Sequence, residues 1–315
     1  MPHDPGSNSP DRVTRSAEER SRRRIFPRPR HLFCVPIAVA LVLLPAVSPG
    51  QASLAIPPVQ LVREVIYNEL QDHSRHGSWR YSIEQQEPNE TRLVEQIETA
   101  DGPVKRLLRA NGQPLDATRE QAELARLDHL LTSPAEQAHA RQEFAEDQVR
   151  IGRIMAMFPD AFLFDYAGQQ DGCHHLRFHS NPSYTAHTIE SRIFHSMTGD
   201  LWVDARLKRI VRVEGHLQNN IDIGFGLLGR INKSGWFRMQ RTQVAPTEWK
   251  TQRLEIHING SAMLFKTIGR QTSEVRRAFS PVPADLALAQ GIDMLRSHNS
   301  ANLAVPLKPS HSTPR

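Results

Sequence analysis

The chain has 315 residues, with 39 basic and 34 acidic side chains, and this length holds one large domain or two small ones. Eight arginines but only four acidic residues fall within residues 1–55, so 31 basic and 30 acidic residues remain in the rest of the chain. This near-neutral body lacks the broad basic surface that contacts with nucleic-acid phosphates require. Nucleic acid is therefore excluded as a partner.

The first 55 residues have the features of an export signal with an extended basic n-region. Arginines precede the apolar run Leu32–Val47, and small residues follow it, so that cleavage is expected after Ala52 or Ala55. The run is short for a membrane span, which needs roughly 20 residues, and a retained N-terminal anchor is the alternative. We expect a periplasmic protein that meets the membrane only through export or through a retained N-terminal segment.

An amphipathic helix is predicted next, from Pro58 to about His76, because apolar residues recur there at helical spacing. Alternating apolar and polar residues then predict an antiparallel meander over residues 79–110. Its strands are separated by turn signals, among them Asp101-Gly102 and Asn111-Gly112.

A two-helix insertion is predicted at about residues 116–158, where the pattern changes to helical. Thr118 and Ser133 each begin a capping-box pattern, and the second is followed by proline at the first helical position. Helices are therefore expected over residues 118–132 and 134–157, and they should lie against or over the meander.

The chain is predicted to return to strands from Phe162 to about Val282, with further turn signals. These signals are Asp171-Gly172, Asn181-Pro182 and Asn259-Gly260. One domain is expected over residues 56–296, followed by a polar tail at residues 297–315 that we expect to be disordered.

The segment GCHHLRFH, residues 172–179, is a candidate metal site. On a strand, Cys173, His175 and His179 would share one face, and a thiolate with imidazoles suits zinc or copper. Successive same-face residues are roughly 7 Å apart, however, so one strand rarely supplies three ligands to one ion. The favoured interpretation is a solvent-facing strand that is rich in histidine, and we expect neither a metal nor another cofactor.

A second motif, GFGLLG at residues 224–229, matches the G-x-G-x-x-G pattern. No helical pattern follows it, as nucleotide binding would require, so we reject that function. Its apolar content favours a packed connection, with a lid or rim over an apolar cavity as the alternative. Nucleophile motifs such as G-x-S-x-G do not occur in the sequence, and we expect no enzymatic activity.

The stretch GDLWVDARLKRIVRVEGHL, residues 199–217, predicts a β-hairpin in a half-buried sheet. Two alternating apolar runs flank a five-residue turn in which the Asp204 side chain can accept N–H bonds. Arg212 and Glu214 are expected on the polar side with Ile210, whereas Val211 is expected on the apolar side.

This hairpin resembles that of the outer-membrane lipoprotein carrier and lipoprotein-sorting (LolA/LolB-like) superfamily, which includes stress-sensor relatives. The matching residues are G-x-L-W-V-D, a short turn and I-V-R-V-E-G, and the likeness in element order covers about Pro58 to Val282. It implies an α+β fold, a curved and unclosed antiparallel β half-barrel with covering helices, to which this chain adds the two-helix insertion. No receptor-docking residue or ligand contact of the superfamily can be transferred to a position of this chain.

Together with the export signal, the resemblance implies a non-catalytic carrier or sensor that holds a lipid, an acylated protein or another apolar ligand in its cavity. The side chains expected to line or rim this cavity are Trp79, Tyr81, Trp202, Phe225, Leu228 and Trp236. One alternative is a structural or interaction module of the envelope that has a protein partner and no ligand. Another is an exported enzyme or metal-binding protein that uses Cys173, His175 and His179.

Overall fold

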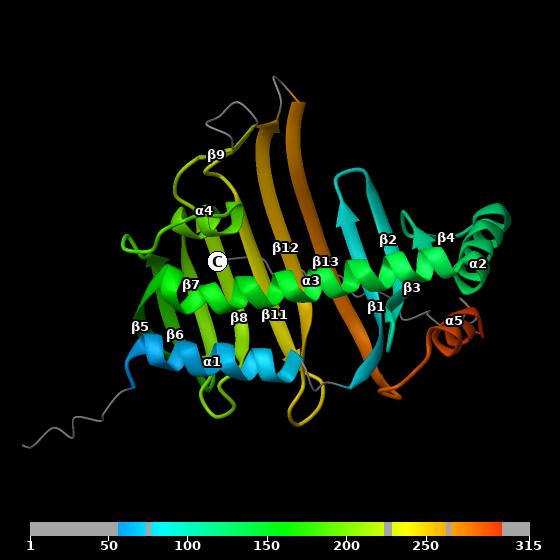
Figure 1. Cartoon of the computed structure of the whole chain (residues 1–315), viewed down its shortest axis with the longest axis horizontal. Helices are drawn as coiled ribbons and strands as arrows, with labels where there is room; N and C mark the ends of the chain where they lie inside the picture. Colours follow the sequence, from blue (N-terminus) through cyan, green and yellow to red (C-terminus); the bar gives the residue numbers. More distant parts are fainter. Residues whose placement is uncertain (1–55, 74–76, 224–228, 263–265, 298–315) are drawn as a thin grey trace, which may run out of the picture. The chain divides into compact units, whose positions relative to one another are not determined.

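A single antiparallel sheet organises the described part of the chain (Figure 1). The computed structural model describes residues 56–73, 77–223, 229–262 and 266–297, which belong to one compact unit. The strands there are β1 (Ser78–Glu87), β2 (Glu90–Thr99), β3 (Gly102–Ala110), β4 (Gln113–Pro114), β5 (Phe162–Gln170), β6 (Cys173–Ser180), β7 (Met197–Asp204), β8 (Ile210–Leu217), β9 (Ile221–Ile223), β10 (Gly229–Ile231), β11 (Trp236–Gln243), β12 (Trp249–Ala262) and β13 (Lys266–Val282). The helices there are α1 (Pro58–His73), α2 (Ala117–Thr132), α3 (Pro134–Ala161), α4 (Ile189–His195) and α5 (Leu288–Ser297).

The sheet is curved and is not closed into a barrel. Its strands follow the order β4-β3-β2-β1-β13-β12-β11-β8-β7-β6-β5, with β10 between β9 and β12, and the end strands β4 and β5 do not pair with each other. Strands from the start and end of the domain meet in the middle, where β1 pairs with β13. The predicted α+β half-barrel with covering helices and a two-helix insertion is confirmed.

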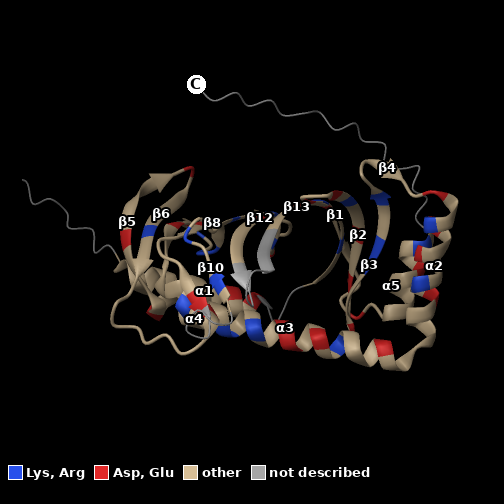
Figure 2. Ribbon diagram, turned by 90° about the horizontal axis from the view of Figure 1, so that it is seen from above, with Lys and Arg blue, Asp and Glu red and all other residues tan. Residues whose placement is uncertain are grey.

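The helices cover the two faces of the sheet unequally (Figure 2). On the inner, concave face, α1 packs Val62 and Val65 against core side chains of β5 to β8 such as Phe178. On the other face, α2 and α5 pack mainly against β2 and β3, around Ile97 and Val104, with Val282 at the end of β13 beside them. The outer face of the remaining strands carries no helix among those described.

Caps and proline set the boundaries of the insertion helices. The Ser133 hydroxyl accepts a bond from the Glu136 N–H, and Pro134 occupies the first turn of α3, as the sequence predicts. The start of α2 was predicted too late, because Asp116 rather than Thr118 is the cap and accepts from the Arg119 N–H at 2.8 Å.

The hairpin of β7 and β8 is confirmed, and the Asp204 carboxylate accepts turn N–H bonds at 3.0 and 2.6 Å. A bulge corrects the expected alternation: Trp202 pairs with Arg212 but Val203 pairs with Ile210. Ile210 therefore turns inward and is buried, whereas Val211 is only half-buried.

One further prediction is corrected, and two helices were not predicted. Asn259-Gly260 is not a turn but lies inside β12, where an added Cβ at Gly260 would stand 2.3 Å from the Arg230 carbonyl of β10. Glycine is needed there because the two backbones approach closely. The helices α4 and α5 were not predicted, since both are short and each follows a polar or proline-containing stretch.

Several predictions fall outside the described residues. They concern the leader at residues 1–55, the tail after Ser297, and most of the GFGLLG loop, including the expected cavity residues Phe225 and Leu228. Among the helices that the structure describes, none combines the length and apolar character needed to cross a membrane.

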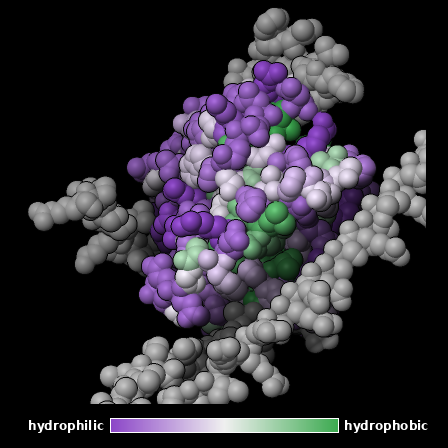
Figure 3. All heavy atoms as spheres, turned by 90° about the vertical axis from the view of Figure 1, so that its left-hand side faces the viewer, coloured by the Kyte–Doolittle hydropathy of each residue, from purple (hydrophilic) through white to green (hydrophobic). Residues whose placement is uncertain are grey.

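The β5 end of the sheet is mostly hydrophilic, with one hydrophobic area (Figure 3). Exposed apolar side chains of β5 and of the segment before α1 include Leu163, Tyr166 and Ile56. The Tyr166 hydroxyl donates to the Ile56 carbonyl at 2.9 Å, which holds the start of the domain against this end strand.

The glycine pair of the hairpin provides a stability test. Gly199 lies opposite Gly215, and an added Cβ at Gly199 would stand 1.9 Å from the Glu214 carbonyl oxygen. Gly199→Ala should therefore lower the free energy of unfolding by about 1–3 kcal/mol or more. Gly152→Ala in α3, where an added Cβ meets nothing within 4 Å, should raise it by up to about 1 kcal/mol. Urea unfolding curves that coincide for both variants would contradict this packing.

Candidate functional site

The long helix α3 contacts the rest of the domain near its C-terminal end and again about a third of the way along. Near its C-terminal end, Phe158 lies in an aromatic cluster with Phe162 and Phe178. Ten residues after the start of the helix, the Phe144 ring packs over Gly102, where β3 begins. Between these two contacts α3 crosses the inner face of the sheet, as Figures 1 and 2 show.

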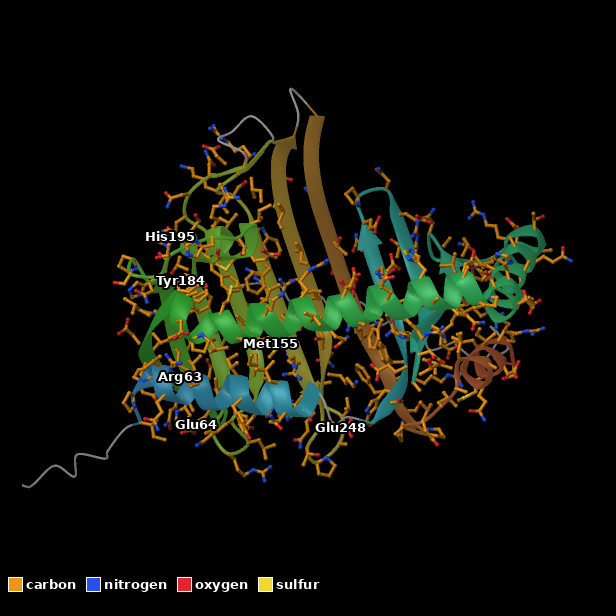
Figure 4. All side chains as sticks on the ribbon, in the orientation of Figure 1. Arg63, Glu64, Met155, Tyr184, His195 and Glu248 are labelled. Atoms are coloured by element: carbon orange, nitrogen blue, oxygen red, sulfur yellow. The ribbon has the colours of Figure 1, made fainter. Side chains whose placement is uncertain are left out.

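A cavity of about 810 Å³ lies between the middle of α3, the end of α1 and the inner face of the sheet. On α3 it is lined by Phe144, Gln148, Ile151 and Met155, whose spacing places them on one side of the helix. Figure 4 labels Met155 on α3 and Glu248 at the turn between β11 and β12. The apolar side chains contributed by the other elements are Leu70, Tyr81, Ile210, Met239, Trp249 and Phe279.

A buried ion network closes the α1 side of the cavity. Glu69 accepts bonds from the Ile210 N–H at 2.8 Å, from Arg209 at 2.9 and 3.2 Å, and from Arg241 at 2.5 Å. Arg209 also donates to Asp72. The Glu69 side chain is 3 % exposed and that of Arg209 is 8 % exposed, so these charges depend on one another for compensation.

A second polar group lies on the sheet side of the cavity, around Glu98. This carboxylate accepts from the Trp79 N–H at 3.1 Å, from the Tyr81 hydroxyl at 3.3 Å and from the Lys250 ammonium at 2.8 and 3.0 Å. Burial raises the pKa of Tyr81 well above its ordinary value, and the Glu98 charge acts in the same direction. The phenol therefore stays protonated and remains a hydrogen-bond donor.

The cations that line the cavity all have acidic partners: Arg241 pairs with Glu69, Lys250 with Glu98, and Arg276 with Glu274. Their charges are thus largely balanced inside the cavity. The lining is mostly apolar on α3, where Gln148 is the polar residue, and mostly polar on the α1 side and around Glu98, which suits a ligand with an apolar body and a polar end.

The structure brings together some of the predicted cavity residues. Tyr81 lines the cavity. Trp79 is buried beside it and joins two lining carboxylates, since its N–H bonds Glu98 and its indole N–H bonds Glu248 at 2.7 Å.

The other two tryptophans predicted for the cavity, Trp202 and Trp236, do not lie there. Trp202 projects from the outer face of β7, because its neighbours Leu201 and Val203 occupy the inner face. Trp236 borders a separate pocket of about 40 Å³, and its ring stacks on His257.

The three weak metal candidates share the outer face of β6, as their spacing predicts. His175 bonds the Asp200 carboxylate at 2.7 Å, and burial, together with Asp204 and Asp171, raises the pKa of the Cys173 thiol. A raised pKa opposes the thiolate that a metal ligand needs. Within the described residues, no group of three or more His, Cys, Asp or Glu side chains is arranged to hold a metal ion.

Other lining residues were missed from the sequence. Ile151 and Gln148 follow Phe144 and precede Met155 at helical spacing, and that signal is present in the sequence. Glu69, Glu98 and Lys250 had no such signal, because they come from α1, β2 and β12 and meet only after the sheet has formed.

No family model and no curated protein matches the chain. Among solved structures, a DUF1329 family protein from Desulfovibrio piger aligns over 71 % of this chain and 93 % of its own length, with 8 % identity and a TM-score of 0.27. The complex structure of Pseudomonas aeruginosa MucA/MucB aligns over 74 % and 95 %, with 9 % identity and a TM-score of 0.21. A structure of MucB in complex with MucA(peri) aligns over 72 % and 94 %, with 9 % identity and a TM-score of 0.20. Similarity at this level carries no argument about function.

The ion network at α1 gives a second stability prediction. Glu69→Ala should destabilise the fold by about 3–5 kcal/mol, because it leaves Arg209 and Arg241 with one buried carboxylate fewer. Glu64→Ala removes a more exposed partner, that of Lys208, and should destabilise the fold much less, because water screens that pair. Thermal unfolding of the two variants measures the difference, and equal losses would show that the network does not anchor α1.

Proposed function

We propose that the protein is an exported, periplasmic carrier or sensor that binds a lipid, an acylated protein or another apolar ligand beneath α3 and catalyses no reaction. The observation that carries the proposal is the cavity of about 810 Å³ between α3 and the inner face of the sheet. Its volume lies within the range of small-molecule sites, roughly 300–1,000 Å³. The periplasmic location rests on the basic and apolar leader sequence.

The inward face of α3 supports an apolar ligand. Phe144 and Ile151 line the cavity and yet are 36 % and 42 % exposed, although a helix normally buries its apolar face. Covering apolar surface is favourable by about 25 cal/mol per Å². A ligand chain that filled the cavity would therefore gain free energy from side chains that the protein alone leaves uncovered.

The polar groups support a ligand with a defined direction. Lys250, Glu98 and the Tyr81 hydroxyl lie together on the sheet side, whereas Ile151 and Met155 lie on the helix side. A ligand with its polar head against the first group and its apolar chain along the second would give both groups a suitable contact.

A cavity-filling variant tests this function directly. Ile151→Trp should weaken the binding of dansyl-labelled undecanoic acid by about tenfold or more, because the indole occupies the volume that the chain needs. Val149→Trp is the matched control, since Val149 is two residues away on α3, is 62 % exposed and does not line the cavity. Fluorescence titration of the processed chain measures both affinities.

Two results would contradict the proposal. One is folded protein that shows no saturable binding of the probe, and the other is equal binding by the two variants. Either would favour the interaction module, in which the half-barrel is a scaffold for a protein partner.

A further inference from the structure

The outer face of the sheet presents an ordered array of basic, aromatic and histidine side chains on the side opposite the cavity. The strand register aligns fifteen outward positions of β6, β7, β8, β11 and β12 in three rows, which we call the outer grid. The rows are His175, Trp202, Arg212, Gln240 and Arg253; then Arg177, Asp200, Glu214, Arg238 and Glu255; then His179, Thr198, His216, Trp236 and His257. The histidine-rich strand and the tryptophan of the hairpin, which the cavity does not use, meet in this grid.

Contacts across neighbouring strands hold the grid in place. Trp202 lies between the His175 ring, stacked at 4.6 Å, and the Arg212 guanidinium, also at 4.6 Å. Glu214 joins the two halves, since it pairs with Arg212 and lies 3.6 Å from Arg238. These planar side chains are preorganised by their neighbours, so little side-chain entropy remains to be lost on binding.

Arg238 continues the array toward β12. Its guanidinium lies 5.0 Å from the Trp236 ring centre, and Trp236 stacks on His257 at 5.7 Å. The array therefore extends over five adjacent strands.

The basic groups of the grid project farther into solvent than the acidic groups. The side chains of Arg212, Arg238 and Arg253 are 47–57 % exposed, whereas those of Asp200, Glu214 and Glu255 are 23–35 % exposed. All cations of the grid are arginines, and Arg and Trp are enriched in protein interfaces whereas Lys is depleted. Among the described helices, α2 and α5 contact mainly β2 and β3, and α1, α3 and α4 pack into the core of the inner face, so this outer face carries no helix.

Four histidines make the charge of the grid dependent on pH. Its four arginines and three carboxylates, together with the exposed Asp165 of β5 that lies opposite Arg177, give a net charge of 0 with neutral histidines, and protonation of all four adds 4. Imidazole is the side chain whose ordinary change of charge falls between about pH 5 and 8.

Each of the four histidines has a different set of neighbouring side chains. His175 faces Asp200 and Trp202, with Arg177 two residues along its strand, and His179 lies between Leu163 and Thr198, also two residues from Arg177. His216 lies between Thr198 and Trp236, two residues from Glu214. His257 faces Trp236 and Gln271, bonds Asn259 at 3.0 Å and is two residues from Glu255.

We propose that the outer grid is a docking surface for an acidic segment of a partner protein, and that this docking strengthens as the pH falls from 7.5 to 5.5. Charge complementarity identifies the occupant: Asp and Glu side chains keep their charge at pH 5.5, where the histidines gain theirs. The grid is on a convex face and has carboxylates between its arginines. An extended carboxylate-bearing chain can follow such rows, whereas a planar anionic membrane would meet both signs of charge.

Fluorescence anisotropy with a fluorescein-labelled octaglutamate peptide tests this surface on the processed full chain. At low salt the peptide should bind about tenfold more tightly at pH 5.5 than at pH 7.5, and added salt should weaken it. Arg212→Gln with Arg238→Gln should lower the affinity at both pH values. His179→Gln with His216→Gln, at two exposed positions, should remove about half of the pH dependence, since His175 and His257 remain, and should keep the binding at pH 7.5.

The matched control is Arg119→Gln with Arg150→Gln, two exposed arginines on α2 and α3, which should behave as wild type. Peptide binding that is equal at the two pH values, or that the grid variants leave unchanged, would overturn the proposal. The proposal would also be overturned if the peptide did not bind, but phosphatidylglycerol vesicles bound more tightly at low pH and less tightly to the grid variants. The outcome is independent of the cavity, because Ile151→Trp leaves the grid intact.

Discussion

The attachment of α3 at two separated points is the constraint on which the candidate site depends. Aromatic packing around Phe158 fixes its C-terminal end and the contact of Phe144 with Gly102 fixes a point in its N-terminal half, so the segment between them must cross a concave sheet. A straight helix and a curved sheet diverge between two such contacts. The space is left as a cavity with apolar residues on its helix side, and the open sheet thereby provides a binding volume without closing into a barrel.

The energetics of the two walls differ. On the α1 side, the nearly fully buried Glu69 carboxylate compensates the charges of Arg209 and Arg241. Loss of one partner therefore leaves a buried charge that water cannot solvate. On the α3 side, Ile151 and Phe144 remain partly uncovered. A rigid, charge-compensated wall and an adaptable apolar wall together favour a ligand that is held by its chain and oriented by its head.

The individual helices and strands were largely predictable because their signals are local, whereas the half-barrel arrangement was expected from the resemblance of the hairpin. The pair Ser133-Pro134 predicted the start of α3, and the turn that begins at Asp204 predicted the β7–β8 hairpin. The cavity was only partly predictable, because alternation on a strand shows that two faces exist but not which face is inward. Trp202 was therefore placed in the cavity, whereas Leu201 and Val203 occupy the inner face and leave it outside. Polar lining residues from α1, β2 and β12 become neighbours only through long-range pairing, which no local pattern records.

The central claim is that the cavity beneath α3 holds an apolar ligand. Its most direct test is mass spectrometry of an organic extract from protein that was exported with its own leader and purified gently in the processed form. The account predicts a lipid or acyl species in near-stoichiometric amount, and that species should be lost from the Ile151→Trp variant and kept by Val149→Trp. A clean extract from folded wild-type protein would contradict the claim and would leave the half-barrel as a scaffold for protein interactions.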